Sequence, residues 1–571
     1  MPTPARRRAR RRRGRTSWLV GKLGLSTSDY PADRRGFIGI QIDGLGYYVL
    51  KGALTRRYAP FLRKLVRRRG WRLHRYRVGV PATTPASQLG IMYGDNWDVP
   101  GFRWLEKDRR ELCITKSASV CASVEERIRK RSAARGEHGV LRGGSSYCNM
   151  FAGEADSATL TLSRLGTRDR ARLRWTDVAI FALLTIGVVL RALVLSAWEI
   201  LVEIYDHLRA VQEGRRTRDE GVFPIVRAIT NVMFREIATQ GCLLDIYRGV
   251  PFVFLNFSGY DEVAHHRGPN SIYARIVLRG IDRQVRRIVR AVERFAAREY
   301  DVVLLSDHGQ ATTTPFEHLH GQSLIDFITE QEAQARLHGV GADHRAKQMG
   351  RVLSFGVWLR ELEWMLPRAL GRVVAWLGRR LIDRLPDEAL DLDWSREGSV
   401  LVAPTGSLAH VYFTDEPRAL TIDEVRARAP ALYDALVAHP SIAAVAARTA
   451  RGVEIRSAKG ALVIHDDHVE RSGEHPLSAY LDGSELVDDV VRLVSMPHAG
   501  DLVLFSAKHG GRVVNFQVEM GSHGGLHHDE QSAFVLVPPD VDFDFSTVKS
   551  IRDLYRLFAR YHAREEMSAV G

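Results

Sequence analysis

The stretch NFSGYDEVAHHRGPN, residues 256–270, combines side chains that could bind a metal ion. Asp261 precedes His265 by four residues, and a second imidazole, His266, follows directly. The stretch comes after an apolar run, VPFVFL, which is typical of a buried strand. Carboxylate and imidazole are both ligands that zinc and manganese accept. A polar loop with a satisfied histidine would look the same, so the interpretation depends on the rest of the chain.

Three further polar clusters also follow apolar strands. Asp43 ends the run GFIGIQI, Asp307 and His308 follow DVVLLS, and His523 follows the strand pair predicted within residues 500–516. Open α/β sheets bind ligands at the carboxyl ends of their strands. If these strands share one parallel sheet, all the clusters converge on one edge. The candidate metal ligands are Asp43, Asp261, His265, Asp307, His308 and His523.

This ligand set suits a pair of divalent cations and the displacement of a phosphoryl group. Two metal ions about 3.5–4 Å apart can clamp the attacking and the leaving oxygen of such a displacement. The reaction also needs a nucleophile, and the run PATTP offers two, Thr83 and Thr84. An alcohol bound to a metal ion loses its proton near neutral pH, because coordination lowers its pKa.

The elements that must position these residues alternate between strand and helix. Strands are expected at residues 36–42, 250–257 and 300–306, and a long amphipathic helix at 271–298. This alternation predicts a mainly parallel α/β sheet. Residues 256–270 are expected to form a polar loop that a Gly268-Pro269 turn fixes.

The chain of 571 residues is long enough for several structural units. We expect a disordered basic tail at 1–35 and the first part of a catalytic core at 36–340, with a helical, apolar insertion at 165–240. A helical insertion and a smaller α+β accessory lobe are expected at 341–499. Residues 500–571 are then expected to return to the core, beginning with a hairpin-like segment at 500–516.

The net charge of +15 is concentrated at one end of the chain. Eight arginines lie within residues 6–15, and removing them leaves +7. A block of like charges is expected to be disordered and could bind an anionic membrane surface. A solvated tail without a specific partner explains it equally well, and nucleic acid is not expected as a specific partner.

Residues 178–202 are apolar except for two charged residues, Arg191 and Glu199. The length would allow a membrane-spanning helix, but an arginine near its centre makes insertion costly. A buried helix and an interfacial helix are the alternatives. No signal peptide is recognisable, and the four cysteines are scattered without a CxxC pair. The sequence therefore predicts a cytoplasmic protein, with association to a membrane as an open alternative.

Several motifs, in order, resemble the alkaline phosphatase superfamily, in its type I phosphodiesterase/nucleotide pyrophosphatase branch. IQIDGLG resembles the first Asp-Gly motif of the family, and PATTPASQLGIMYG resembles its nucleophile loop. YDEVAHHRGP is similar to D-x-x-x-H-x-x-G-P, LSDHGQ to Asp-His-Gly, and GSHGG to the final His-Gly. The resemblance implies a three-layer core of the alkaline phosphatase type. It is spread over residues 36–325 and 500–540.

The resemblance also implies roles for individual residues. One metal would be bound by Asp261, His265 and His523, and the second by Asp43, Asp307 and His308. Two zinc ions are expected, with manganese as the alternative. Thr84 is expected to be the nucleophile and to form a phosphothreonine intermediate, although the Thr-x-Pro pattern of the nucleotide pyrophosphatases would favour Thr83. Asn96 and Asn149 are candidates for binding a phosphoryl oxygen, and each could instead be a capping or turn residue.

Other residues have weaker claims to a role. His266 is expected to lie beside the site rather than in it, and Glu262 could orient a ligand histidine. His527 and His528 are rivals of His523 for the last ligand position. A sulfatase is disfavoured, because residues 83–87 contain neither the nucleophile nor the arginine of C/S-x-P-x-R.

These inferences predict a two-metal phosphoric ester hydrolase of phosphodiesterase, phosphatase or pyrophosphatase type. One alternative is a transferase that acts on the phosphoryl headgroup of a lipid-linked or membrane-associated substrate. Another is a catalytically silent, membrane-associated scaffold with the same fold. The scaffold is disfavoured, because all six ligand candidates and a threonine are present.

Overall fold

The computed structural model describes residues 33–165, 223–331, 400–465 and 467–563, together with positions 28, 30, 338, 339, 372 and 376. The Arg-rich tail and the apolar segment 178–202 lie outside the described residues. So does the predicted Arg- and Trp-rich helical insertion, apart from the isolated positions 372 and 376.

The first sheet has seven strands in the order β2-β21-β8-β1-β7-β5-β6. Its pairs β8–β1, β1–β7, β7–β5 and β5–β6 are parallel, whereas β2–β21 and β21–β8 are antiparallel. The predicted mainly parallel sheet is therefore confirmed. The strands are β1 (Gly36–Ile42), β2 (Arg72–Arg77), β5 (Ser145–Tyr147), β6 (Ser157–Thr159), β7 (Phe252–Phe257), β8 (Tyr300–Leu305) and β21 (Ser532–Val537).

Strands β1, β7 and β8 are buried along their whole length. This is why their sequences are continuous apolar runs rather than alternating ones. Gln41 pairs with Asn256 of β7 on one side and with Leu305 of β8 on the other. The three strands therefore end in register, and the polar residues that follow them leave the sheet at the same edge.

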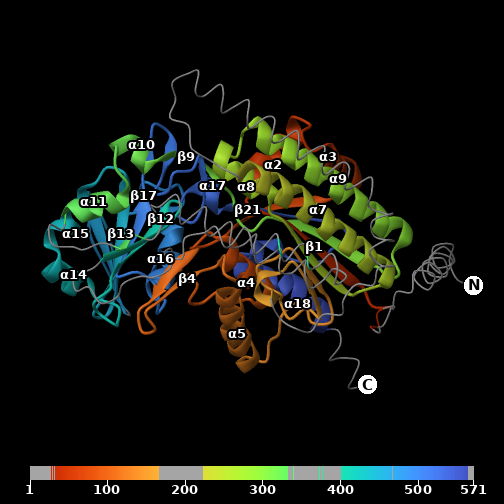
Figure 1. Ribbon diagram of the computed structural model, residues 1–571, viewed down its shortest axis with the longest axis horizontal. Coiled ribbons are helices and arrows are strands. Elements are labelled where there is room, and N and C mark those ends of the chain that lie inside the picture. Colours follow the sequence, from red (N-terminus) through yellow and green to blue (C-terminus); the bar gives the residue numbers. More distant parts are fainter. Residues whose placement is uncertain are drawn as a thin grey trace, which may run out of the picture.

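Helices cover both faces of this sheet (Figure 1). Two separate apolar clusters, one on each face, hold the layers together, and the predicted three-layer α/β class is confirmed. One face carries α2 (Tyr47–Thr55), α3 (Pro60–Arg69), α7 (Phe223–Arg248), α8 (Gly259–Arg267) and α9 (Ile272–Phe295). The other carries α4 (Thr84–Tyr93), α5 (Ala118–Ala134) and α18 (Tyr555–Ala563).

Helix α8 corrects the prediction of a polar loop after β7. Although its sequence is mostly polar, Tyr260, Val263 and Ala264 are buried in the apolar cluster of the helical layer. Gly268 ends the helix with a φ of 84°, a conformation that other residues rarely adopt. Asp261 and His265 are one turn apart on this helix, so their side chains lie on the same face.

A second, eight-stranded sheet has the order β10-β11-β12-β17-β13-β14-β15-β16 and lies to the left in Figure 1. Helices α14 (Ile422–Arg428) and α15 (Pro430–Ala438) cover one face, and α16 (Val487–Val494) packs on the other. The strands are β10 (His338–Gly339), β11 (Val400–Thr405), β12 (Leu408–Phe413), β13 (Ile442–Thr449), β14 (Gly452–Ser457), β15 (Gly460–His465), β16 (Val469–Gly473) and β17 (Leu502–Ser506).

The predicted return to the core at residue 500 is wrong for its first strand. β17 lies in the middle of the second sheet, between β12 and β13. It is buried on both faces, and a fully apolar strand fits the interior of either sheet equally well. The chain re-enters the first sheet only at β21.

A small four-stranded sheet connects the two larger ones. β19 (Arg512–Asn515) and β20 (Gly521–Ser522) both pair with β9 (Ala311–Pro315), and β18 (Lys508–His509) completes the order β18-β19-β9-β20. Because β9 follows Asp307 and His308 and β20 directly precedes His523, this pairing brings the last predicted ligand next to the others.

Within the described part of the chain, no helix is both long and apolar enough to cross a membrane. The four cysteines are all free.

Candidate functional site

The six predicted ligands form two groups at the carboxyl edge of the first sheet. Asp43, Asp307 and His308 make one group, which we call the inner group. Asp261, His265 and His523 make the other, the outer group. In each group, one ligand atom from every residue lies within 4.8 Å of the others. The two groups adjoin, since the rings of His308 and His523 stack with their centroids 3.7 Å apart.

The inner group is buried completely. Asp307 and His308 are 0% exposed and Asp43 is 3% exposed. His308 Nε2 lies 3.4 Å from Asp307 Oδ2 and 3.7 Å from Asp43 Oδ1. Asp307 Oδ1 accepts a hydrogen bond from the Gly44 backbone N–H, but its Oδ2 is buried without a hydrogen-bond partner. A buried carboxylate oxygen without a partner is costly, and a cation would satisfy it.

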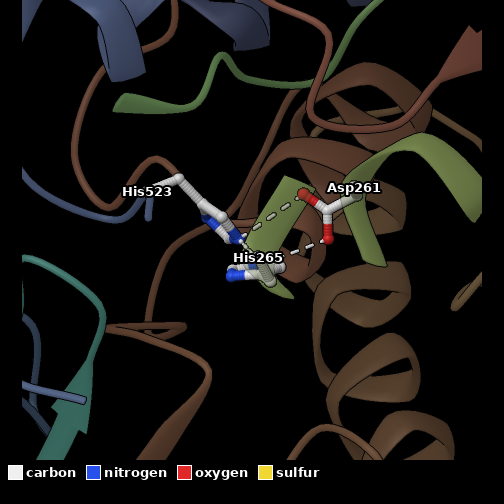
Figure 2. A group of neighbouring side chains, drawn as sticks. All are labelled: Asp261, His265 and His523. Atoms are coloured by element: carbon white, nitrogen blue, oxygen red, sulfur yellow. Dashed lines mark hydrogen bonds and ion pairs between the residues drawn. The ribbon is translucent and has the colours of Figure 1, made fainter. Parts of the chain in front are cut away.

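The outer group is more open to solvent and is drawn in Figure 2. Asp261 and His265 are partly exposed, whereas His523 is buried. His265 Nε2 lies 3.3 Å from Asp261 Oδ2, and His523 Nε2 lies 3.9 Å from Asp261 Oδ1. The two Nε2 atoms of His265 and His523 face each other at 3.1 Å.

All three imidazoles are held through Nδ1. His308 Nδ1 lies 3.0 Å from the Gly309 carbonyl oxygen, and His523 Nδ1 lies 2.8 Å from that of Ala82. His265 Nδ1 lies 3.1 Å from the Gly521 carbonyl oxygen. A carbonyl oxygen can only accept, so each Nδ1 carries a hydrogen, and in the neutral form of each ring the Nε2 lone pair faces the site. Histidines that ligate metals are oriented in the same way.

The charges within the site also favour a cation. Burial, together with the charges of Asp307 and Asp261, raises the pKa of Asp43 well above its ordinary value. Burial and the nearby Asp261 raise the pKa of Asp307 to about 7. Burial and the neighbouring His523 lower the pKa of His308, which keeps that imidazole neutral. The inner group thus gathers two carboxylates without a positive side chain, and its donor set fits a divalent metal ion.

His265 and Asp261 form an ion pair in the outer group. Burial lowers the pKa of His265, but the carboxylates of Asp261 and Glu519 outweigh burial and raise it well above its ordinary value. Burial would raise the pKa of Asp261, and the imidazoles of His265 and His523 outweigh it, so the carboxyl remains ionised. A metal ion in this group must therefore displace a proton from His265.

Thr84 points into the inner group and Thr83 does not. The Thr84 hydroxyl lies 3.3 Å from Asp43 Oδ1 and 3.1 Å from His308 Nε2. Thr83 is the N-cap of α4, and its buried hydroxyl has no hydrogen-bond partner. Thr84 is the first residue of this ten-residue helix, where the helix dipole favours negative charge. The geometry supports Thr84 over Thr83 as the nucleophile.

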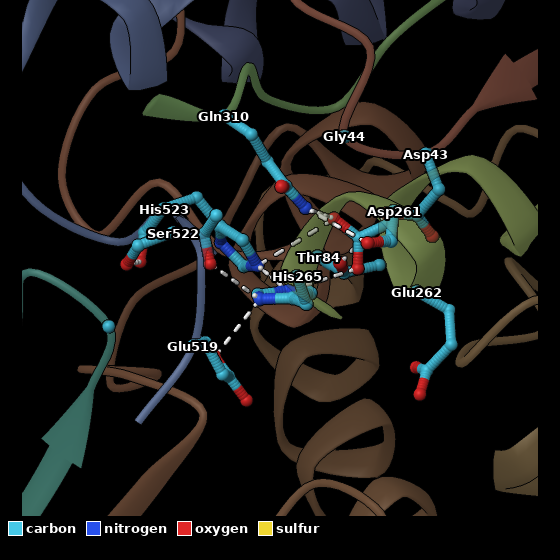
Figure 3. Close-up of polar contacts among 12 residues, drawn as sticks. Asp43, Gly44, Thr84, Asp261, Glu262, His265, Gln310, Glu519, Ser522 and His523 are labelled. Atoms are coloured by element: carbon cyan, nitrogen blue, oxygen red, sulfur yellow. Dashed lines mark hydrogen bonds and ion pairs between the residues drawn. The ribbon is translucent and has the colours of Figure 1, made fainter. Parts of the chain in front are cut away.

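Three supporting residues were missed in the sequence (Figure 3 shows two of them). Asn256 donates to Asp43 Oδ2 at 2.7 Å, Gln310 donates to Asp261 Oδ1, and Glu519 Oε2 lies 3.0 Å from His265 Nδ1. Asn256 is a polar residue inside an apolar strand, and Gln310 directly follows Asp-His-Gly. These two signals were visible in the sequence. Glu519 has no such signal, because its partner is 254 positions earlier in the chain.

The predicted substrate ligands Asn96 and Asn149 are engaged elsewhere, which corrects that prediction. Asn149 is 2% exposed, and its amide nitrogen donates to Ser146 Oγ and to the Phe254 carbonyl oxygen. The side-chain oxygen of Asn96 accepts from Arg492 at 2.9 Å. Asn149 therefore uses its side-chain amide within the fold, and the side-chain oxygen of Asn96 is bound to Arg492.

The rival histidines also have other partners. His266 Nε2 lies 3.5 Å from Glu262 Oε1, so Glu262 pairs with a histidine that is not a candidate ligand. His527 Nε2 lies 3.0 Å from the Ser506 carbonyl oxygen, and His528 Nδ1 lies 3.1 Å from Asp482 Oδ2. Neither His266 nor its neighbours in the comparison, His527 and His528, belong to the outer group, which contains His523.

A family model described as type I phosphodiesterase / nucleotide pyrophosphatase matches residues 208–397. The predicted resemblance is confirmed. The type I phosphodiesterase match covers fewer than half of the residues and contains Asp261, His265, Asp307 and His308. Asp43, Thr84 and His523 lie outside it. A search of curated proteins found no match.

Two kinds of solved structure are similar to this chain along most of its length. Phosphonoacetate hydrolase from Sinorhizobium meliloti 1021, in complex with phosphonoformate, is 15% identical, with a TM-score of 0.44. That comparison covers 94% of this chain and 97% of the hydrolase. Murine ectonucleotide pyrophosphatase / phosphodiesterase 5 is 10% identical, with a TM-score of 0.43, over 92% of this chain and 94% of the murine protein.

Proposed function

We propose that this protein is a two-metal phosphoric ester hydrolase that uses Thr84 as its nucleophile. The observation that carries the proposal is the position of the Thr84 hydroxyl, within 3.3 Å of two inner-group ligand atoms. The outer group adjoins on the side of His523. The family match to type I phosphodiesterases supports phosphoric esters as the substrate class.

The residues of the chain would act in a fixed order. Asp43 and His308 hold the Thr84 oxygen in place at the start of α4. After its proton has passed to solvent, this oxygen attacks phosphorus; the bond to the leaving group breaks as the Thr84 O–P bond forms, and the leaving alcohol or phosphate departs with the electron pair and takes up a proton from solvent. Water then cleaves the phosphothreonine from the opposite side and restores the hydroxyl. The positive end of the α4 dipole favours the added negative charge at Thr84.

The inner and outer groups would each hold one divalent cation. Bound there, the two cations would supply the positive charge that lowers the pKa of the threonine hydroxyl and stabilises the phosphoryl oxygens. Imidazole and carboxylate ligands without thiolate suit zinc and also manganese.

The test compares Thr84→Ala with Thr83→Ala as its matched control. Both variants lose one hydroxyl from adjacent residues, but only Thr84 contacts the inner group. We expect wild type and Thr83→Ala to hydrolyse bis-p-nitrophenyl phosphate or p-nitrophenyl phosphate with added Zn²⁺ or Mn²⁺. Thr84→Ala should lose about 1000-fold in kcat.

The outcomes separate the alternatives. If no phosphate ester is turned over with either metal, the chain is not this hydrolase, and the scaffold alternative is favoured. Equal activity in wild type and Thr84→Ala would exclude Thr84 as the nucleophile. Preference for p-nitrophenyl sulfate would contradict the substrate class.

A further inference from the structure

The helices α3 and α9 carry an unusually one-sided charge. Residues 44–94, which include α3, contain 11 lysines and arginines and no aspartate or glutamate. α9 contains seven arginines and two acids, Asp282 and Glu293. The exposed faces of helices usually carry both positive and negative side chains. An excess of positive side chains of this size on neighbouring helices indicates an anionic partner.

Three contacts hold α3 and α9 side by side and parallel (Figure 1). Arg275 lies over the Tyr58 ring at 4.9 Å, near the beginnings of the two helices. Asp282 accepts hydrogen bonds from the backbone N–H groups of Phe61 at 3.0 Å and Leu62 at 2.8 Å. Arg69 pairs with Glu293 near the two ends. The two acids of α9 are thus used to fix α3, and they leave the outward arginines in excess.

The outward side of α9 forms a straight stripe. Arg279, Arg283, Arg286 and Arg290 are all exposed and follow one another at spacings of four, three and four residues. At 1.5 Å per residue, the four guanidinium groups extend over about 16 Å. On the neighbouring helix α3, Lys64, Arg67 and Arg68 are exposed as well.

The stripe continues at its N-terminal end with two exposed isoleucines. Ile272 is 64% exposed and Ile276 is 52% exposed, and both keep the same helical spacing as the arginines. Single exposed aliphatic side chains are common, but two neighbouring ones at the end of a basic stripe form an apolar patch that a partner can cover. We call this surface, made of Ile272, Ile276, Arg279, Arg283, Arg286 and Arg290 with Lys64, Arg67 and Arg68, the basic face.

We propose that the basic face docks on an anionic lipid bilayer. Phosphate groups of the lipids would accept from the guanidinium groups, and the two isoleucines would enter the boundary between headgroups and acyl chains. Duplex nucleic acid supplies the same phosphates but no apolar layer, so the isoleucines would remain in water. The charge and the exposed aliphatic side chains together therefore fit a membrane better.

The apolar end of the stripe is the end nearest the candidate site in sequence. α9 begins five residues after α8, which carries Asp261 and His265. Docking through the basic face would bring this part of the protein toward the lipid. The docking itself does not depend on turnover, so it can be tested independently of the proposed function.

The experiment measures binding of the full chain to vesicles of phosphatidylcholine with and without phosphatidylglycerol. The stripe variant reverses four charges, Arg279→Glu, Arg283→Glu, Arg286→Glu and Arg290→Glu. The control reverses four exposed cations elsewhere, Arg110→Glu, Lys130→Glu, Arg471→Glu and Arg512→Glu, and has the same net charge. We expect the stripe variant to lose about tenfold or more in affinity for anionic vesicles, and the control to stay within about twofold of wild type.

A second variant, Ile272→Ser with Ile276→Ser, separates a membrane from other anions. It should weaken vesicle binding about threefold and leave binding to a duplex DNA unchanged. Equal losses in the stripe variant and its control would reduce the effect to net charge and overturn the proposal. It would also be overturned by unchanged vesicle binding in the stripe variant, or by a loss confined to DNA. If the stripe variant fails to fold, arginine-to-glutamine changes at the same positions provide the same test.

Discussion

The inner and outer groups use similar side chains in different surroundings. The inner group is closed off from solvent, contains two carboxylates and is braced by Gly44 and Asn256. The outer group is partly exposed, and its two imidazoles are held by carbonyl oxygens and by Glu519. The difference suggests that a cation in the inner group exchanges slowly, whereas a cation in the outer group can exchange with solvent.

The largest effect is expected from the inner group. Asp307→Asn removes a charge whose Oδ2 is buried without a hydrogen-bond partner. It should lower kcat for a phosphodiester about 1000-fold, because the charge-stabilising cation beside Thr84 would be lost. Added metal should not restore activity, since the ligand set is incomplete and buried. Recovery at millimolar Zn²⁺ would contradict the assignment of Asp307.

His523→Ala tests the outer group in the same way. We expect kcat to fall about 100-fold at limiting metal, as the cation there loses one of three ligands. Excess Zn²⁺ or Mn²⁺ should recover much of the loss, because Asp261 and His265 remain reachable from solvent. His527→Ala is the control, and it should keep the metal dependence of wild type. An irrecoverable loss in His523→Ala would erase the proposed distinction between the groups.

Glu519→Gln should produce a smaller effect that is restricted to the outer group. Glu519 lies 3.0 Å from His265 Nδ1, and partners of this kind orient metal-binding histidines. The metal concentration for half-maximal activity should rise about tenfold, with kcat at saturating metal nearly unchanged. Glu262→Gln is the matched control, because Glu262 pairs with His266 instead. If the metal concentration for half-maximal activity rises equally in Glu519→Gln and Glu262→Gln, Glu519 does not orient His265.

The smallest effect concerns the pH dependence of stability after treatment with a chelator. The pKa of Asp307 is raised to about 7 by burial and by Asp261. Such a group stabilises the folded state fully at low pH, and the contribution is lost as the pH rises through about 7. The metal-free protein should therefore melt several degrees lower at about pH 8 than at about pH 5. Asp307→Asn should reduce this difference, and a difference of the opposite sign would contradict the pKa.

The sequence predicted the strands well because they depend on local pattern, and the same pattern predicted that the candidate ligands converge on one edge of the sheet. Asp43, Asp261 and Asp307 each follow an apolar strand, and the parallel register β7-β1-β8 brings their strand ends together. His523 was associated with them because it follows an apolar strand pair and through the motif order of a family, whereas the structure positions it by a separate small sheet. The structure distinguishes Thr84 from Thr83 by the direction of the side chain, which depends on where α4 begins.

The errors come from properties that depend on tertiary contacts. Helix α8 was expected to be a loop, because its sequence is mostly polar and its buried residues, Gly259, Tyr260, Val263 and Ala264, owe their burial to tertiary contacts. Asn149 was expected at the substrate, but neighbouring elements already saturate its amide. β17 is buried along its whole length, and such an apolar strand fits the interior of either sheet, so its sequence does not show which sheet it joins. None of these outcomes could follow from residue type and spacing alone.

The central claim, two separable cation sites of which the inner one lies beside Thr84, is tested most directly by counting metal ions. Elemental analysis of zinc-loaded protein after gel filtration should find two ions per chain in wild type. It should find one ion in Asp307→Asn and one in His523→Ala. A chelator should remove the remaining ion faster from Asp307→Asn, because that variant keeps only the outer group. No bound zinc in wild type, or loss of both ions in each variant, would contradict the account.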